Sequence, residues 1–230
     1  MLDKSNQFLG KGMYTVGEAA WYCRVSTRLM SRWLFGTTSG EPVMVPQFGA
    51  DQRLVSFLDL VQTLAVREIR THYKVPLSKI REAIKYAEDE LKLYRPFARQ
   101  HCTYLYNDLL VIRRTQDQED FVEASGRQKG QRQFPFVEMY LKSLDFTPDG
   151  LAYKYRIFAS NHPKPVSVTM DPEVRFGEPL LLSGYTALTI YEAIKTEGGV
   201  EQAAEAYGIA AEEAEAAYQF ADHMSPTSAA

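Results

Sequence analysis

Apolar residues recur at three- and four-residue spacing through much of residues 13–91, for example at Leu60, Leu64 and Ile69. This spacing places apolar side chains on one face of an α-helix. The front of the chain is therefore predicted to be mostly helical. A helix pattern restarts after Val75-Pro76, because proline is tolerated at the start of a helix but not in its interior.

The pattern changes after residue 100 to short runs of β-branched and aromatic residues separated by turn residues. Asp149-Gly150 is a strong signal for a tight hairpin turn. The two predicted hairpins are Thr103–Tyr106 with Leu109–Arg113 around Asn107-Asp108, and the strands between Phe146 and Phe158 around Asp149-Gly150.

The segment 160–165 contains two prolines among polar residues and is predicted to be an extended linker. Beyond it, Thr189 and Glu192 form a predicted capping box, and Gly198-Gly199 end the helix that follows. The fold class expected is α+β and helix-rich. The expected domains are 10–75, a small α+β middle domain at 76–160, and a helical domain at 166–222.

Residues 14–34 are predicted to form two short helices. Thr15 with Glu18 is a capping box for the first helix, and Ser26 is suited to cap the second. The predicted inward stripe is Val16, Ala20, Val25, Leu29 and Trp33. The opposite, polar face consists of Thr27, Arg28, Ser31 and Arg32. This layout is typical of a helix-turn-helix, whose second helix enters the major groove of DNA.

This segment resembles the winged helix-turn-helix of MerR-type regulators, which open with Tyr-Thr-hydrophobic-x-Glu-Ala-Ala, as at residues 14–20, and carry Trp or Tyr at the end of the recognition helix, as Trp33 does. Residues 43–47 and 53–60 resemble the wing and the next helix, with Ser56 and Asp59 as a capping pair. The helix that stops near residues 93–96 departs from that family's single long dimerisation helix. The DNA-binding residues expected are Thr15, Arg24, Ser26, Thr27, Arg28, Ser31, Arg32 and Arg53.

The C-terminal segment resembles the antitoxin-like family called domain of unknown function four-three-three. The matching residues are Asp171, Pro172, Gly177, Pro179 and Gly184. The chain departs from that family at Glu178 and at Tyr185-Thr186, where positive charge is usual. A second helix-turn-helix-like pair follows at 201–220, and its acidic residues form either a solvated face or a docking surface for a protein. These residues are Glu205, Glu212, Glu213 and Glu215.

Charge is distributed unevenly along the chain. Residues 1–100 hold 15 Lys/Arg against 10 Asp/Glu, whereas residues 166–230 hold 2 against 11. Because the phosphate backbone attracts cations and repels carboxylates, any contact with nucleic acid is expected from the first hundred residues.

Catalytic and metal-binding patterns are missing from the sequence. The four histidines stand far apart with no HExxH or Cys/His spacing, and no nucleophile motif occurs. We therefore expect no enzyme activity, no cofactor and no metal. Cys23 and Cys102 are expected to be reduced thiols. The loop 125–132 is either a flexible surface loop, a contact to the DNA backbone or a basic finger aimed at an acidic partner, with Arg127, Lys129 and Arg132 as candidate partner-binding residues.

Together these features resemble the longer VapB-type antitoxins. The resemblance implies a homodimeric antitoxin that represses its own operon by binding double-stranded promoter DNA and neutralises a PIN-domain ribonuclease toxin. No apolar run is long enough for a membrane helix, and a cytoplasmic location is expected. The alternative is a one-component MerR-like transcription regulator that senses a small molecule through its aromatic middle domain.

Overall fold

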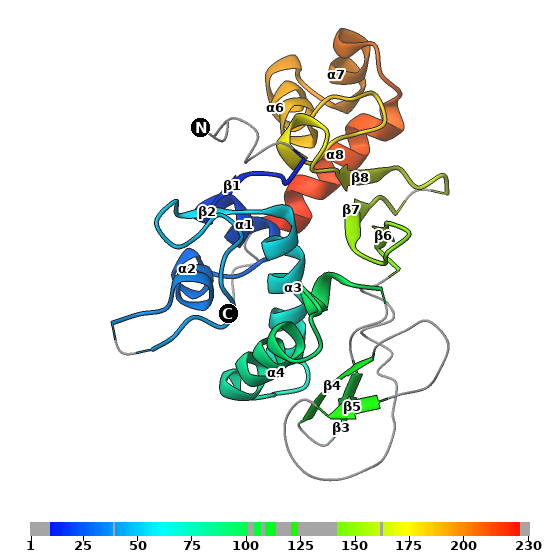
Figure 1. Ribbon diagram of the computed structural model, residues 1–230. Coiled ribbons are helices and arrows are strands. Elements are labelled where there is room, and N and C mark those ends of the chain that lie inside the picture. The colour runs from blue at the N-terminus through cyan, green and yellow to red at the C-terminus, as the bar shows by residue number, and fades with distance from the viewer. Residues whose placement is uncertain are drawn as a thin grey trace, which may run out of the picture. The chain divides into compact units, whose positions relative to one another are not determined.

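The computed structural model describes residues 10–38, 40–100, 104–106, 109–113, 121–123, 142–161 and 163–225 (Figure 1). The protein is a mixed α+β protein rich in helices, as expected. Its contacts divide it into two compact units, Met13–Tyr153 and Lys154–Ala230 together with Met1–Gly12. The division into domains at 10–75, 76–160 and 166–222 stays a prediction. None of the helices in the described ranges is long and apolar enough to cross a membrane.

The first unit begins with four helices, as the apolar spacing predicted, and a small sheet. Strands β1 and β2 are antiparallel, with Tyr14 opposite Val55. The elements are β1 (Tyr14–Thr15), α1 (Val16–Tyr22), α2 (Thr27–Phe35), β2 (Leu54–Val55), α3 (Phe57–Thr71), α4 (Leu77–Asp89) and the 3-10 helix η2 (Pro96–Ala98).

Helix α3 forms the centre of this unit and is buried along most of its length. The predicted periodic residues Leu60, Leu64 and Ile69 are at most 2% exposed. Ser56 and Asp59 form the predicted capping box at its start. Cys23 is a buried free thiol, and burial raises its pKa to about 12, so this side chain stays protonated at neutral pH.

A buried ion pair joins three separate segments of this unit. The carboxylate of Asp59 on α3 lies 2.9 Å from Nη1 of Arg95, and both side chains are almost completely buried. The other carboxylate oxygen, Oδ2, accepts hydrogen bonds from the backbone N–H groups of Ser56 and Gln47. Nη1 of Arg95 also donates to the carbonyl of Val45 at 2.7 Å. The pair therefore fastens the loop before α3 to α3 and to the segment after α4.

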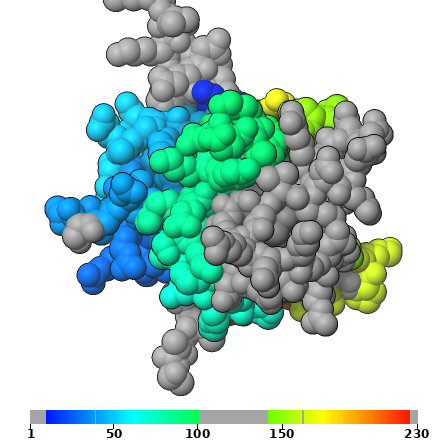
Figure 2. Space-filling view, turned by 60° about the horizontal axis from the view of Figure 1, so that its bottom comes forward, coloured from blue at the N-terminus to red at the C-terminus, as the bar shows by residue number. Residues whose placement is uncertain are grey.

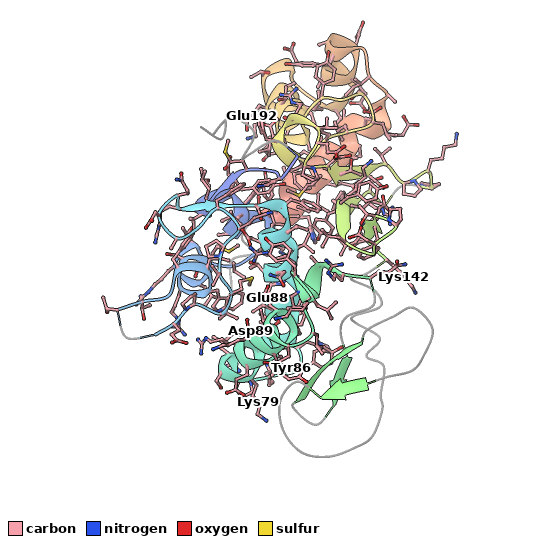
Figure 3. The ribbon with its side chains drawn as sticks, in the orientation of Figure 1. Lys79, Tyr86, Glu88, Asp89, Lys142 and Glu192 are labelled. Atoms are coloured by element: carbon pink, nitrogen blue, oxygen red, sulfur yellow. The ribbon has the colours of Figure 1, made fainter. Side chains whose placement is uncertain are left out.

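Glu88 lies near the end of α4, where Figure 3 labels it, and its carboxylate accepts the backbone N–H of Arg95 at 3.4 Å. Burial raises the pKa of Glu88, although the positive charge of Arg95 acts in the opposite direction. The ionised carboxylate is therefore less favourable in the folded protein than in the unfolded chain.

Three further strands confirm the first predicted hairpin. Strands β3 (Tyr104–Tyr106), β4 (Leu109–Arg113) and β5 (Phe121–Glu123) form an antiparallel sheet in the order β3-β4-β5, with Tyr106 opposite Leu109. Asn107-Asp108 and the basic loop residues Arg127, Lys129 and Arg132 lie outside the described residues.

The second predicted hairpin is also confirmed. Its strands are β6 (Leu144–Phe146) and β7 (Ala152–Ala159), in a sheet with the order β6-β7-β8. The N–H of Gly150 donates to the carbonyl of Thr147 at 2.8 Å, and Gly150 has a φ of 81° that suits glycine.

The prediction of an extended linker at 160–165 is wrong. Strand β7 pairs antiparallel with β8 (Ser167–Met170), so that Ala159 lies opposite Ser167. The N–H of Ser160 donates to the carbonyl of Val166, and the hydroxyl of Ser160 accepts the N–H of Val166. These bonds close a hairpin connection, and prolines suit such a loop as well as they suit a linker, which the local composition does not distinguish.

The second unit continues with a short 3-10 helix, η3 (Arg175–Gly177), and then α6 (Ala187–Glu197), α7 (Val200–Tyr207) and α8 (Ala211–Met224). The predicted capping box of Thr189 and Glu192 is wrong, because Thr186 is the N-cap. Thr186 has extended backbone angles, and its hydroxyl accepts the N–H of Thr189 at 3.0 Å. Gly198 ends α6 in the left-handed conformation, as predicted.

We expect Asp59→Ala to lower the free energy of unfolding by about 3–5 kcal/mol, because it leaves the buried guanidinium of Arg95 without its counter-charge. Chemical denaturation followed by circular dichroism measures this loss. The control is Glu90→Ala, at the exposed position directly after α4, and it is expected to change the free energy of unfolding by less than about 0.5 kcal/mol. Equal stability of the two variants would contradict the structural role of the pair.

Glu88→Gln is expected to raise the free energy of unfolding at pH 7, because it removes a carboxylate that burial makes unfavourable. The gain should shrink as the pH falls toward the ordinary value of 4.5, where wild-type Glu88 becomes protonated in both states. Denaturation curves at several pH values measure it, with the exposed Asp89→Asn as control. A gain that does not vary with pH contradicts this origin.

Candidate nucleic-acid interface

Helices α1 and α2 pack together through small and apolar residues, and each begins at a predicted cap. The hydroxyl of Thr15 accepts the N–H of Glu18, and the carboxylate of Glu18 accepts the N–H of Thr15 in return. The hydroxyl of Ser26 accepts the N–H of Leu29 at 3.2 Å. Between the helices, the N–H of Val25 donates to the carbonyl of Ala20, which closes the turn. The caps thus fix where both helices begin.

The predicted inward stripe is only partly buried. Ala20 and Trp33 are buried, whereas Val16, Val25 and Leu29 are half-buried. Burial on α2 is completed by two apolar residues outside the stripe, Met30 and Leu34, both at 0% exposure. The buried residues of α2 are therefore Met30, Trp33 and Leu34, which lie three and four positions apart on one face of the helix.

The polar face of α2 is turned to solvent, as predicted. Thr27, Arg28 and Arg32 are exposed, and Ser31 is half-buried. Within the part of the chain that the structure describes, the side chains of Arg28 and Arg32 form no hydrogen bond and no ion pair. The two guanidinium groups are therefore available to an external acceptor such as a phosphate or a guanine edge.

Arg53 joins this face from the loop that follows α2. Its Nη2 donates to the hydroxyl of Ser31 at 3.0 Å, and its guanidinium lies 4.4 Å from the centre of the Phe35 ring. Arg53 itself is in the left-handed conformation, with a φ of 52°. These contacts place Arg53 beside Ser31, so two separately predicted DNA-binding residues come together.

The loop between α2 and β2, residues 36–53, contains no strand in its described part, although residues 43–47 resembled a wing. Backbone bonds close it instead. The N–H of Val43 donates to the carbonyl of Trp33 at 2.7 Å, and Thr37 pairs with Gly40. A Cβ on Gly36 would lie 2.7 Å from the carbonyl oxygen of Gly40, so this turn requires glycine.

Arg81 on α4 is a residue of this region that the sequence analysis did not single out. Its Nε donates to the carbonyl of Pro42 at 2.7 Å, and its Nη2 donates to the carbonyl of Glu41 at 2.8 Å. In the space-filling view, the blue atoms of α2 and the following loop adjoin the green atoms of α4 and the segment after it (Figure 2). No sequence motif marks Arg81, because a bond from a side chain to a distant carbonyl leaves no local pattern.

The remaining predicted site residues differ in their surroundings. Thr15 and Ser26 are engaged as caps, and Arg24 is exposed in the turn between the helices with a φ of 51°. Their contact with DNA stays a prediction. In the predicted acidic face of residues 201–220, Glu205 is exposed, Glu213 accepts the N–H of Ser183 and Glu215 accepts the side-chain amide of Gln219. The described ranges contain no group of three or more His, Cys, Asp or Glu residues that is placed to hold a metal ion.

Comparison with known proteins gives a likeness in fold alone. No family model and no curated protein matches this chain. The crystal structure of Rv2018 from Mycobacterium tuberculosis is similar with a TM-score of 0.57 and 18% identity, and the likeness covers 89% of this chain and 96% of that one. The fold is thus shared with another protein over most of the length of both.

Ser26→Ala is expected to lower the free energy of unfolding by about 1 kcal/mol, because the N–H of Leu29 loses its acceptor. Thermal or chemical denaturation measures the change. The control is Thr27→Ala at the neighbouring exposed position, where a change of less than about 0.5 kcal/mol is expected. If both variants lose the same amount, Ser26 does not act as the cap.

Proposed function

We propose that this protein binds double-stranded DNA through the exposed face of α2 and represses its own promoter. The observation that carries the proposal is the pair of unpartnered arginines on α2, Arg28 and Arg32, with Arg53 held beside them. Helix α2 spans two and a half turns, is anchored by its apolar side, and presents arginine spacing that suits one face of the major groove. In this proposal the loop 36–53 acts as the wing of a winged helix-turn-helix.

The three arginines would contact different parts of the DNA, because their surroundings differ. Arg28 and Arg32 are free to reach base edges, where a bidentate contact to guanine is the commonest specific contact. The guanidinium of Arg53 is fixed by Ser31 and Phe35, so it suits a backbone phosphate, which needs position rather than sequence reading. A homodimer would place two copies of α2 in successive major grooves of an inverted repeat.

The wider role proposed is that of a type II antitoxin, and it rests on the resemblance of the two ends of the chain to VapB-type antitoxins. Its partner would be a PIN-domain ribonuclease, and the chain itself would perform no catalysis. Residues 166–230 would not bind DNA, because 2 Lys/Arg stand against 11 Asp/Glu there. Affinity purification of the tagged protein from its host, followed by mass spectrometry, tests this role. A stoichiometric small ribonuclease is expected, and a homodimer retained alone would refute the antitoxin role.

Replacing Arg28 or Arg32 with Ala is expected to weaken binding to DNA from immediately upstream of the gene by about 1–3 kcal/mol where the residue reads a base. If the residue meets only phosphate, the slope of log K against log salt should fall by about one. Fluorescence anisotropy at several salt concentrations measures both quantities.

The matched control is Lys85→Ala, which removes one exposed cation from α4. It should leave affinity and salt slope close to those of the wild type. A double variant, Arg28→Ala with Arg32→Ala, that keeps wild-type affinity and salt slope would discard the assignment of α2 as the DNA-reading helix.

A further inference from the structure

A pocket of about 560 Å³ lies between α2, the loop after it and the start of α4. Its apolar lining comes from Trp33, Val43 and Leu77, and three arginines, Arg28, Arg32 and Arg81, contribute positive charge. This volume is in the range of small-molecule sites, which combine an apolar wall with a few convergent polar groups.

The residues that line the pocket carry a net positive charge, which favours the binding of an anion. Arg28 and Arg32 have no acceptor among the described residues, and Glu41 is the single acidic residue of the lining. Arg81 is held in place because its Nε and Nη2 donate to the carbonyls of Pro42 and Glu41. Its Nη1 has no hydrogen bond within the described ranges, so a rigidly placed donor remains available.

Trp33 lines the pocket and also contains a buried donor without an acceptor. Trp33 is 2% exposed, and its indole Nε1 has no hydrogen-bond partner among the residues described. Leaving such a group unpaired is unfavourable. The indole nitrogen is closed to solvent, so Trp33 contributes lining to the pocket and not a donor to a ligand.

Helix α4 begins at the same pocket. Leu77 is its first residue, Pro76 is the N-cap, and no side chain caps the helix. Its first turn contains no acidic residue. The free N–H groups and the positive end of the helix dipole therefore add to the attraction for an anion.

We propose that this pocket binds a phosphate group. Three guanidinium groups and an uncapped helix start offer more donors than one carboxylate accepts, and a tetrahedral phosphate accepts from several directions at once. The inference rests on the proposed function in one respect. Arg28 and Arg32 belong both to the α2 face proposed to bind DNA and to the lining of the pocket. A phosphate ester held in the pocket therefore competes with DNA. The phosphate comes either from the DNA backbone or from a small phosphate ester.

The direct test is the indole ¹H–¹⁵N signal of Trp33 in the full-length protein, recorded during titration with inorganic phosphate and with phenyl phosphate at constant ionic strength. The chain has two tryptophans, so Trp21→Phe assigns both indole signals. The Trp33 signal is expected to shift and to saturate because this residue lines the pocket, while that of Trp21 stays in place. A Trp33 signal that does not move with either probe in the millimolar range overturns the proposal.

Two variants test the cationic lining. Arg81→Gln is expected to weaken phosphate binding at least tenfold, and Lys85→Gln on the same helix should leave it unchanged. Leu77→Glu places a carboxylate at the start of α4, where negative charge stabilises a helix, and it should abolish phosphate binding without unfolding the protein. Wild-type phosphate affinity in both Arg81→Gln and Leu77→Glu also overturns the proposal.

Binding of the upstream DNA fragment distinguishes the two sources. If a backbone phosphate occupies the pocket, Arg81→Gln weakens DNA binding without any ligand and lowers the salt slope by about one. If a small ester occupies it, Arg81→Gln leaves the salt slope of DNA binding unchanged but removes the competition by phenyl phosphate. A wild-type protein that binds no DNA refutes the proposed function, and the Trp33 titration still decides the pocket separately.

Discussion

The first unit depends on the buried ion pair of Asp59 and Arg95. Taking two charges out of water is costly, and the cost is offset only when each is also hydrogen-bonded. Asp59 is hydrogen-bonded to two backbone N–H groups and Arg95 to the carbonyl of Val45, whereas the buried Nε of Arg95 has no hydrogen-bond partner among the described residues. The pair therefore serves as the point where the loop before α3, α3 itself and the chain after α4 are held together.

The ion pair also helps to position the candidate DNA-binding face, because Asp59 holds the loop 36–53 through Gln47. Described residues of this loop form no strand, so its shape comes from polar anchors at three places. Val43 is bound to α2, the carbonyls of Glu41 and Pro42 are bound by Arg81, and Gln47 is bound by Asp59. A loop fixed along its length places Arg53 beside α2 at a smaller entropic cost on binding than a free loop would.

Local chemistry was readable from the sequence. The caps of α1, α2 and α3, the solvent-facing side of α2 and the turn at Asp149-Gly150 all depend on residues a few positions apart. The errors arose where a residue has more than one local role. Thr189 is a plausible cap, but Thr186 three residues earlier takes that position, and the prolines near residue 160 serve a hairpin connection.

Interactions between distant segments left no such signal. In the sequence, Arg95 follows a predicted helix without belonging to any motif, and Arg81 is one of several cations in that helix. Only the folded chain brings Arg95 to Asp59 and Arg81 to the loop after α2. The pocket beside Trp33 could not be foreseen for the same reason, since its lining combines α2, that loop and the start of α4.

The central claim is that the α2 face and the loop anchored beside it meet DNA. Hydrogen–deuterium exchange of the full-length protein, with and without the DNA from upstream of its gene, tests it most directly. We expect slower exchange on DNA binding in residues 26–37 and around Arg53, with little change in residues 166–224. Protection confined to residues 166–224, with none in α2, would contradict it.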